Sequence, residues 1–147
     1  MSENVWNFAH TVECGAPREF AWRYWTNPEN WDDPPARFEF DGPFTAGTRL
    51  TTILPGQRFE SVLREVLPGS AALIEMDVGG ATVRFRWNFS ELAPERTKIR
   101  QEITLSGQGS ATLVGPAKAM ELTVPDGMKR IAGRIERAWR ETRGGRG

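Results

Sequence analysis

The chain has 147 residues, the size of one domain, whereas two cores of ordinary size would need about 200 residues or more. Its 19 basic and 19 acidic residues give a formal net charge of zero, which argues against a nucleic-acid partner. A single cysteine and a single histidine exclude an internal disulfide and any zinc site built from several such ligands, so no metal is expected.

The sequence also predicts where the protein resides. No apolar run approaches the roughly 18 residues of a membrane span, so no integral membrane segment is expected. The start, MSENVWN, lacks a basic region followed by an apolar stretch. We therefore expect a cytoplasmic protein.

The first part of the chain predicts one strand and two short helices. Residues 4–14 alternate between apolar and polar, which indicates a strand with one buried side. The residues on that side are Trp6, Phe8, His10, Val12 and Cys14. Pro17 suits the first turn of a helix that continues to about Thr26. Asn27 and Pro28 then favour a second short helix, closed by Trp31.

The middle of the chain predicts about six further strands separated by glycine and proline turns. Apolar and polar residues alternate along most of them, as in an antiparallel sheet with one wet face. The expected strands cover residues 37–41, 48–54, 58–66, 72–78, 83–89 and 98–105.

The last part predicts a small-residue loop and then a helix. Residues 107–115 favour the loop or a weak edge strand, and apolar residues recur at helical spacing from Met128 onward. Residues 124–127, which include Pro125, should kink or interrupt any helix that begins near Pro116. We expect one domain over 4–141 and a disordered tail over 142–147.

The order of elements and several turn segments resemble the SRPBCC superfamily (START-related, Bet v 1-like), especially its bacterial polyketide cyclase/dehydrase-like branch. The segments that carry the resemblance are APREFAW (16–22), TNPENW (26–31), FDGPFTAGT (40–48), Pro68 after a strand, GATVRFRW (80–87) and TLSG (104–107). The resemblance covers roughly residues 4–141.

This resemblance implies an α+β helix-grip fold: a curved six- to seven-stranded antiparallel sheet around a long C-terminal helix, with two short helices after the first strand. One helix is too narrow to fill the concave side of such a sheet. We therefore expect an apolar cavity between the two, as the family's binding of apolar or aromatic molecules also implies. Fold does not fix chemistry among these proteins, so no catalytic residue is assigned.

The candidate ligand-binding residues are those on predicted inward faces. They are His10, Trp25, Trp31, Phe38, Phe40, Phe59, Arg64, Met76, Phe85, Trp87, Phe89, Gln101, Met120 and Met128. His10 is either a general acid or base or a histidine bonded to backbone. Gln101 either orients a ligand or bonds a neighbouring side chain. Arg64 either holds a ligand carboxylate or enolate or is turned outward by a bulge.

Three functions follow as hypotheses. The first is binding of a small apolar or aromatic metabolite, lipid-like or polyketide-like, in the cavity. The second is a polyketide aromatase/cyclase, with His10, Arg64 or Gln101 handling protons or oxyanions. The third is a protein-interaction module such as a chaperone regulator. The sequence carries no phosphate loop or dinucleotide fingerprint, so no cofactor is expected.

Two features remain open at this level. A homodimer is compatible with the sequence. Residues 129–147 hold seven basic and two acidic residues, which suits either an ordinary solvated helix end or contact with an anionic membrane or acidic partner.

Overall fold

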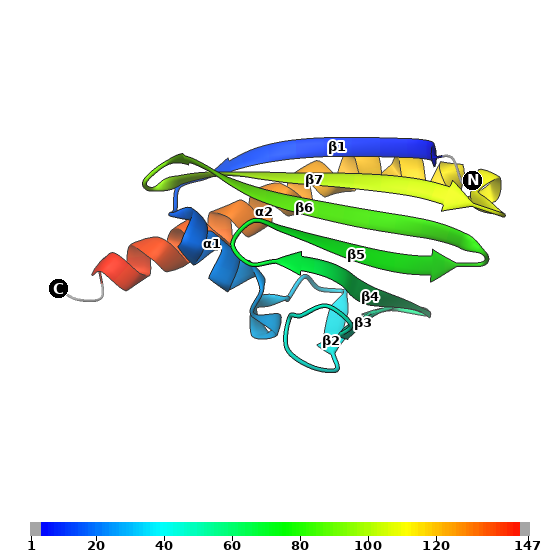
Figure 1. Cartoon of the computed structure of the whole chain (residues 1–147), viewed down its shortest axis with the longest axis horizontal. Helices are drawn as coiled ribbons and strands as arrows, with labels where there is room; N and C mark the ends of the chain where they lie inside the picture. Colours follow the sequence, from blue (N-terminus) through cyan, green and yellow to red (C-terminus); the bar gives the residue numbers. More distant parts are fainter. Residues whose placement is uncertain (1–3, 145–147) are drawn as a thin grey trace.

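Seven antiparallel strands form one curved sheet in the computed structural model, which describes residues 4–144 (Figure 1). The strands are β1 (Asn4–Cys14), β2 (Arg37–Phe40), β3 (Arg49–Leu54), β4 (Gln57–Leu67), β5 (Ala71–Val78), β6 (Ala81–Ala93) and β7 (Arg96–Gly107). Their order is β1-β7-β6-β5-β4-β3-β2, so β1 and β2 are the two edges. The predicted antiparallel sheet is therefore confirmed, with every predicted strand present.

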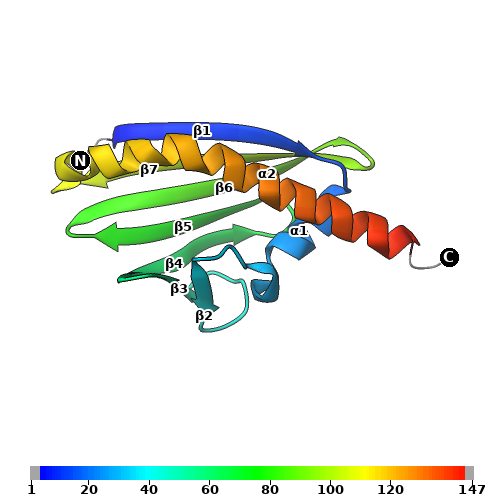
Figure 2. The same cartoon turned by 180° about the vertical axis from the view of Figure 1, so that it is seen from behind.

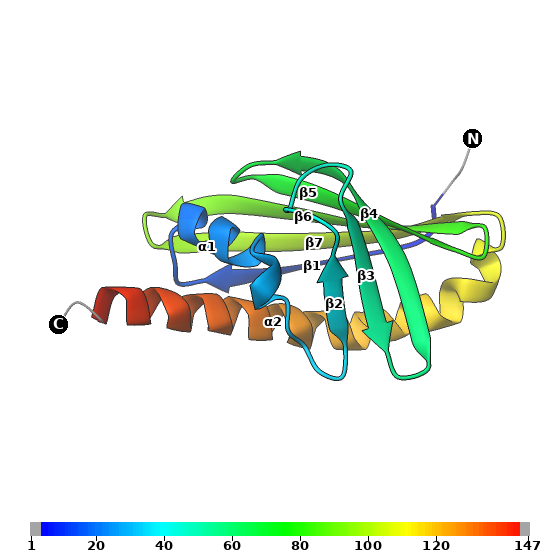
Figure 3. The ribbon, with the colours of Figure 1, turned by 90° about the horizontal axis from the view of Figure 1, so that it is seen from below.

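The helices lie on the concave side of the sheet. They are α1 (Arg18–Trp25), the 3-10 turns η1 (Pro28–Asn30) and η2 (Ser110–Leu113), and α2 (Val114–Gly144). Figure 2 shows α2 crossing this side along β1, with α1 beside its C-terminal half. Figure 3 shows the β2–β4 end of the sheet bending toward the level of α2. This is the arrangement that the resemblance implied.

The long helix is more regular than its sequence predicts. It runs without interruption from Val114 to Gly144 with Pro125 inside it, so the expected break at 124–127 is wrong. Val124 and Met128, on either side of Pro125, pack in the core, and this packing offsets the backbone hydrogen bond that proline removes. Residues 142–144 are helical rather than part of a disordered tail, and 145–147 lie outside the described residues.

The core is divided into two clusters along α2. One lies at the α1 end, around Trp25, Phe89 and Met128. The other lies at the opposite end, where Trp6 and Ile103 of the sheet meet Ala117 of α2. Phe85 and Val124 are partly buried against both clusters and so join them.

None of the helices within residues 4–144 combines the length and the apolar run that crossing a bilayer would need.

Candidate functional site

A pocket of about 190 Å³ opens at the α1 end of the molecule, between α1, η1, the sheet and α2. Its lining residues are Tyr24, Trp25, Asn30, Trp31, Asp32, Asp33, Phe38, Trp87, Gly127, Arg130, Ile131 and Arg134. Five of these twelve residues are aromatic, and the four charged ones lie in the segment after η1 and on α2.

The turn from α1 into η1 places the two most prominent wall residues. Asn27 caps η1, since its side chain accepts a hydrogen bond from the Glu29 amide at 3.0 Å, and Pro28 occupies the first turn. The Trp31 indole then donates to the carbonyl of Trp25, and the Asn30 side chain donates to the carbonyl of Tyr24 at 2.9 Å. These bonds hold η1 against the end of α1.

The aromatic rings contact one another across four elements. The Trp25 ring centroid lies 4.9 Å from that of Trp87 and 5.7 Å from that of Trp31. Trp31 meets Phe38 edge-on, with centroids 5.4 Å apart. Tilted and edge-on packing at these distances is favourable beyond the area buried, so the wall is a rigid and apolar surface.

The rim is polar and links the segment after η1 to α2. Arg130 pairs with Asp33, with 3.2 Å between Nη2 and Oδ2, and Arg134 donates from Nη1 to the backbone carbonyl of Asp32. Because Arg130 and Arg134 are one turn apart on α2, they reach the same segment. We call residues 32 and 33 with these two arginines the rim strap.

Four of the predicted site residues line this pocket: Trp25, Trp31, Phe38 and Trp87. The other apolar candidates pack elsewhere within the described residues. Phe40, Phe89 and Met128 belong to the cluster at the α1 end, and Met76, Phe85 and Met120 pack against the opposite one. The hollow is thus smaller than expected, because the second cluster fills the other half of the space under α2.

His10 and Gln101 face the concave side, as predicted, but do not line the pocket. They are directly opposite each other across β1 and β7, and Gln101 is opposite Trp87 of β6. Gln101 is buried, whereas His10 is half-buried and stacked on Phe8 with centroids 6.5 Å apart. Phe59 is half-buried on β4, away from the pocket.

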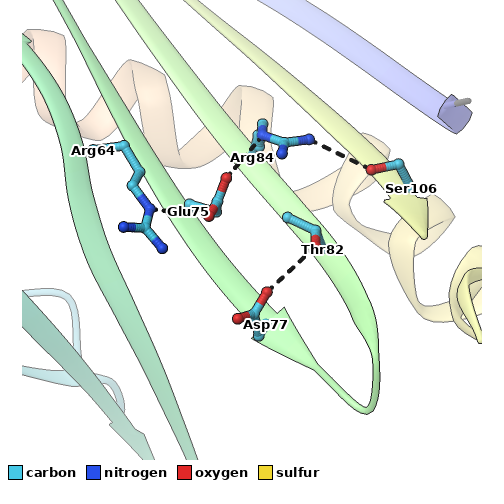
Figure 4. A network of polar contacts seen from close by, with 6 residues as sticks. All are labelled: Arg64, Glu75, Asp77, Thr82, Arg84 and Ser106. Atoms are coloured by element: carbon cyan, nitrogen blue, oxygen red, sulfur yellow. Dashed lines mark hydrogen bonds and ion pairs between the residues drawn. The ribbon is translucent and has the colours of Figure 1, made fainter. Parts of the chain in front are cut away.

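Of the two alternatives for Arg64, the inward one is wrong and the outward one is correct. Leu63 is fully buried, so Arg64, the next residue along β4, faces the convex side. The register shift between Leu63 and Glu65 marks a bulge, after which Val66 packs against the core. There Glu75 accepts from Arg64 at 3.0 Å and from Arg84 at 2.9 Å, while Arg84 also reaches Ser106 (Figure 4). A separate pair on the same face joins Thr82 to Asp77. Arg64 is thus part of a surface ion-pair network.

Sequence reasoning missed the α2 side of the pocket. Arg130, Ile131 and Arg134 are absent from the candidate ligand-binding residues, but all three line the pocket. A signal existed in their spacing, because Gly127, Ile131 and Arg134 follow one another at three and four residues along one flank. Nothing in the sequence indicates that η1 lies opposite that flank.

No group of three or more potential metal ligands comes together in residues 4–144.

The sequence matches no protein-family model and no curated protein. Solved structures, in contrast, match most of the chain. Norcoclaurine synthase from Thalictrum flavum has a TM-score of 0.69 and 14% identity, covering 92% of this chain and 86% of that one. Ara h 8.0201 has a TM-score of 0.64 and 14% identity, covering 92% and 98%.

A third structure is DynU16, a protein of the dynemicin biosynthetic locus, with a TM-score of 0.60 and 19% identity. The match covers 89% of this chain but only 46% of DynU16. At these identities the likeness concerns the backbone arrangement, in which a curved seven-stranded sheet grips a long C-terminal helix. The chain therefore has the helix-grip fold of the Bet v 1-like, or SRPBCC, proteins.

Proposed function

We propose that the protein binds a small aromatic molecule, of about one ring with a short substituent, in the pocket between η1 and α2. The observation that carries this proposal is the volume of about 190 Å³ behind walls of tryptophan and phenylalanine. An apolar cavity of about 150 Å³ accepts benzene, so this pocket has room for one substituted ring. Burial of the ring's apolar surface supplies the affinity.

The same volume narrows the range of ligands. A lipid chain or a folded polyketide is several times larger than one ring, so it exceeds this pocket. Norcoclaurine synthase, which has the same fold, was crystallised with dopamine and hydroxybenzaldehyde, and both of these are single-ring molecules. Only the fold links norcoclaurine synthase to this chain, but the size of its two bound molecules agrees with the volume of this pocket.

Binding is favoured over cyclase chemistry by where the polar candidates lie. His10, Arg64 and Gln101, the residues suggested for handling protons or oxyanions, do not line the pocket. At its rim, the side chains of Arg130, Arg134 and Asp33 are instead engaged in the rim strap. We therefore propose a binding protein or carrier for a single-ring compound.

A titration with ring compounds and a fatty acid tests the proposal. Benzaldehyde, phenol and indole should each quench or shift tryptophan fluorescence with saturation, whereas palmitate should not compete. The variant Ile131→Trp fills the pocket and should abolish binding. Leu122→Trp adds the same side chain on the exposed side of α2, where Leu122 is 80% exposed, and should leave binding unchanged.

A second variant keeps the proposal testable if Ile131→Trp does not fold. Phe38→Ala enlarges the pocket at a partly buried position of β2 and should shift preference toward two-ring compounds such as naphthalene. Absence of saturable binding by any ring compound to the folded wild-type chain would overturn the proposal.

A further inference from the structure

The mouth of the aromatic pocket carries two charges of each sign. Asp32 and Asp33 lie in the segment after η1, and Arg130 and Arg134 lie across from them on α2. Asp33 and Arg130 neutralise each other, because their side chains form an ion pair with 3.2 Å between Nη2 and Oδ2. The charges that can meet a ligand without breaking an existing ion pair are therefore those of Asp32 and Arg134.

Arg134 and Asp32 touch each other, but not charge to charge. The Arg134 guanidinium is half-buried and donates from Nη1 to the backbone carbonyl of Asp32, which is a neutral group. This bond uses one of the five N–H donors of the guanidinium. The Asp32 side chain is exposed. In the part of the chain that the structure describes, neither residue takes part in an ion pair. The mouth thus presents one cation and one anion that a bound molecule can engage.

The bond between the two residues also limits how far apart their charges lie. The carboxylate of an aspartate is only a few bonds from the carbonyl of the same residue, so the Asp32 carboxylate lies within roughly 8 Å of the Arg134 guanidinium. The ammonium and carboxylate groups on one carbon atom are about 3 Å apart. Each needs about 2.8 Å to reach a charged partner. The spacing therefore suits a head group that carries both charges.

The balance of charge at the mouth favours such a head group over the alternatives. A neutral head group would displace water from Asp32 and Arg134 without replacing the lost interactions. A lone carboxylate would bind Arg134 but come close to Asp32, and a lone ammonium would bind Asp32 but come close to Arg134. Like charges brought together in this way are unfavourable. Only a zwitterion satisfies both residues.

We propose that the ligand of this pocket is an α-amino acid with a single aromatic ring. The ring packs against Trp25 and Trp87 inside the pocket, the ammonium group meets the Asp32 carboxylate, and the carboxylate group meets Arg134. This inference rests on the proposed function, because it places the ring in the same pocket. It adds the chemical class of the ligand and the two residues that select it. The head group stays at the mouth, so the volume inside the pocket is needed for the ring alone.

The test compares four compounds that share a phenyl ring and differ in the charge of the head group. They are phenylalanine, phenethylamine, hydrocinnamate and hydrocinnamyl alcohol, which are zwitterionic, cationic, anionic and neutral at neutral pH. Isothermal titration calorimetry with the full chain measures each affinity. We expect phenylalanine to bind about fivefold more tightly than each of the other three, since each of these lacks at least one of the two charged contacts at a partly exposed site.

Two substitutions that remove one charge each separate the two contacts. Asp32→Asn should weaken the binding of phenylalanine and phenethylamine but not that of hydrocinnamate. Arg134→Gln should weaken the binding of phenylalanine and hydrocinnamate but not that of phenethylamine. Glu29→Gln and Arg137→Gln are the matched controls, because both residues are exposed, lie close in sequence to the first two and do not line the pocket. These controls should leave all four affinities unchanged.

Phenol, a neutral ring compound, shows whether the pocket itself is intact in each variant. The inference is overturned, with the ring-binding function still standing, if phenol binds but phenylalanine binds no more tightly than its three analogues. It is also overturned if Asp32→Asn and Arg134→Gln bind phenol and otherwise behave like the controls. If no ring compound binds to the folded wild-type chain, the proposed function and this inference are both wrong.

Discussion

The indole of Trp31 donates its hydrogen bond to the backbone carbonyl of Trp25, so one wall of the pocket orients the other. Trp25 ends α1 and Trp31 follows η1, and the chain between them makes a tight turn capped by Asn27. The bond satisfies a carbonyl at the helix end, where no intrahelical partner exists. It also fixes the plane of the Trp31 ring against Phe38.

Trp31→Phe keeps an aromatic ring at this position but removes the N–H donor. We expect the free energy of unfolding to fall by about 1 kcal/mol and ring compounds to bind several-fold more weakly. Urea denaturation and fluorescence titration measure the two effects. Trp139→Phe is the matched control, because that indole bonds to Glu95 away from the pocket. Unchanged affinity in Trp31→Phe would contradict the orienting role.

The rim strap should control how fast a ligand leaves. Replacing Arg130 and Arg134 together with alanine removes both links to residues 32 and 33. We expect the dissociation rate of a bound ring compound to rise several-fold in stopped-flow experiments. Stability should change by less than about 1 kcal/mol, because the ion pair is about half exposed. Arg137→Ala is the control, and a release rate equal to that of wild type would argue against a strap.

A buried hydroxyl ties the turn after β1 to the neighbouring strand. Thr97 of β7 is fully buried and donates from Oγ1 to the carbonyl of Ala16 at 2.7 Å. Thr97→Val keeps the shape but leaves this carbonyl without its partner, so we expect a loss of about 1–3 kcal/mol in unfolding free energy. Thr104→Val, on the half-buried outer side of the same strand, should change stability little. Equal effects of the two substitutions in urea would contradict this account.

Cys14 should make stability depend on alkaline pH. Burial, reinforced by the nearby Glu136 carboxylate, raises the pKa of its thiol from 9.0 to about 12. Above pH 9 the unfolded thiol loses its proton while the folded one keeps it. The stabilisation is therefore complete below pH 9 and is lost as pH rises toward 12. The stability difference between wild type and Cys14→Ala should shrink over this interval, and a constant difference would contradict the assignment.

Pro125 offers a stabilising change. It lies inside the continuous α2 and lacks the N–H that would complete the helical ladder. Pro125→Ala restores that donor, so we expect the free energy of unfolding to rise by about 1 kcal/mol or more. Ala138→Gly, in the same helix, should act in the opposite direction. A drop in the stability of Pro125→Ala would mean that the proline ring packs favourably enough to outweigh the lost bond.

The fold could be predicted because its signals are local. Alternation along residues 83–89 and 98–105 predicts the hairpin of β6 and β7, and Asn27-Pro28 predicts η1. The predicted interruption of the helix at Pro125 was wrong, because tertiary packing outweighs the tendency of proline to break a helix. The register of β4 also depends on a bulge at Arg64, which strict alternation does not reveal.

The site was only partly predictable because it depends on contacts between distant segments. Trp25, Trp31, Phe38 and Trp87 were found as inward aromatics, yet their patterns resemble those of Phe89 and Met128, which are core. All six residues belong to the cluster at the α1 end, and what separates them is which side chains face the opening between η1 and α2. The rim strap joins residues about a hundred positions apart, and no spacing rule connects them.

The joint between the two clusters has a mechanical consequence. Val124, which touches both clusters, immediately precedes the one residue of α2 that cannot donate a ladder hydrogen bond from its own amide. Bending the helix therefore costs least at this joint. Beyond the joint, Met128, Ala132 and Ile135 are buried in the cluster at the α1 end, so side-chain packing there, more than the backbone ladder, keeps the second half of α2 in line with the first.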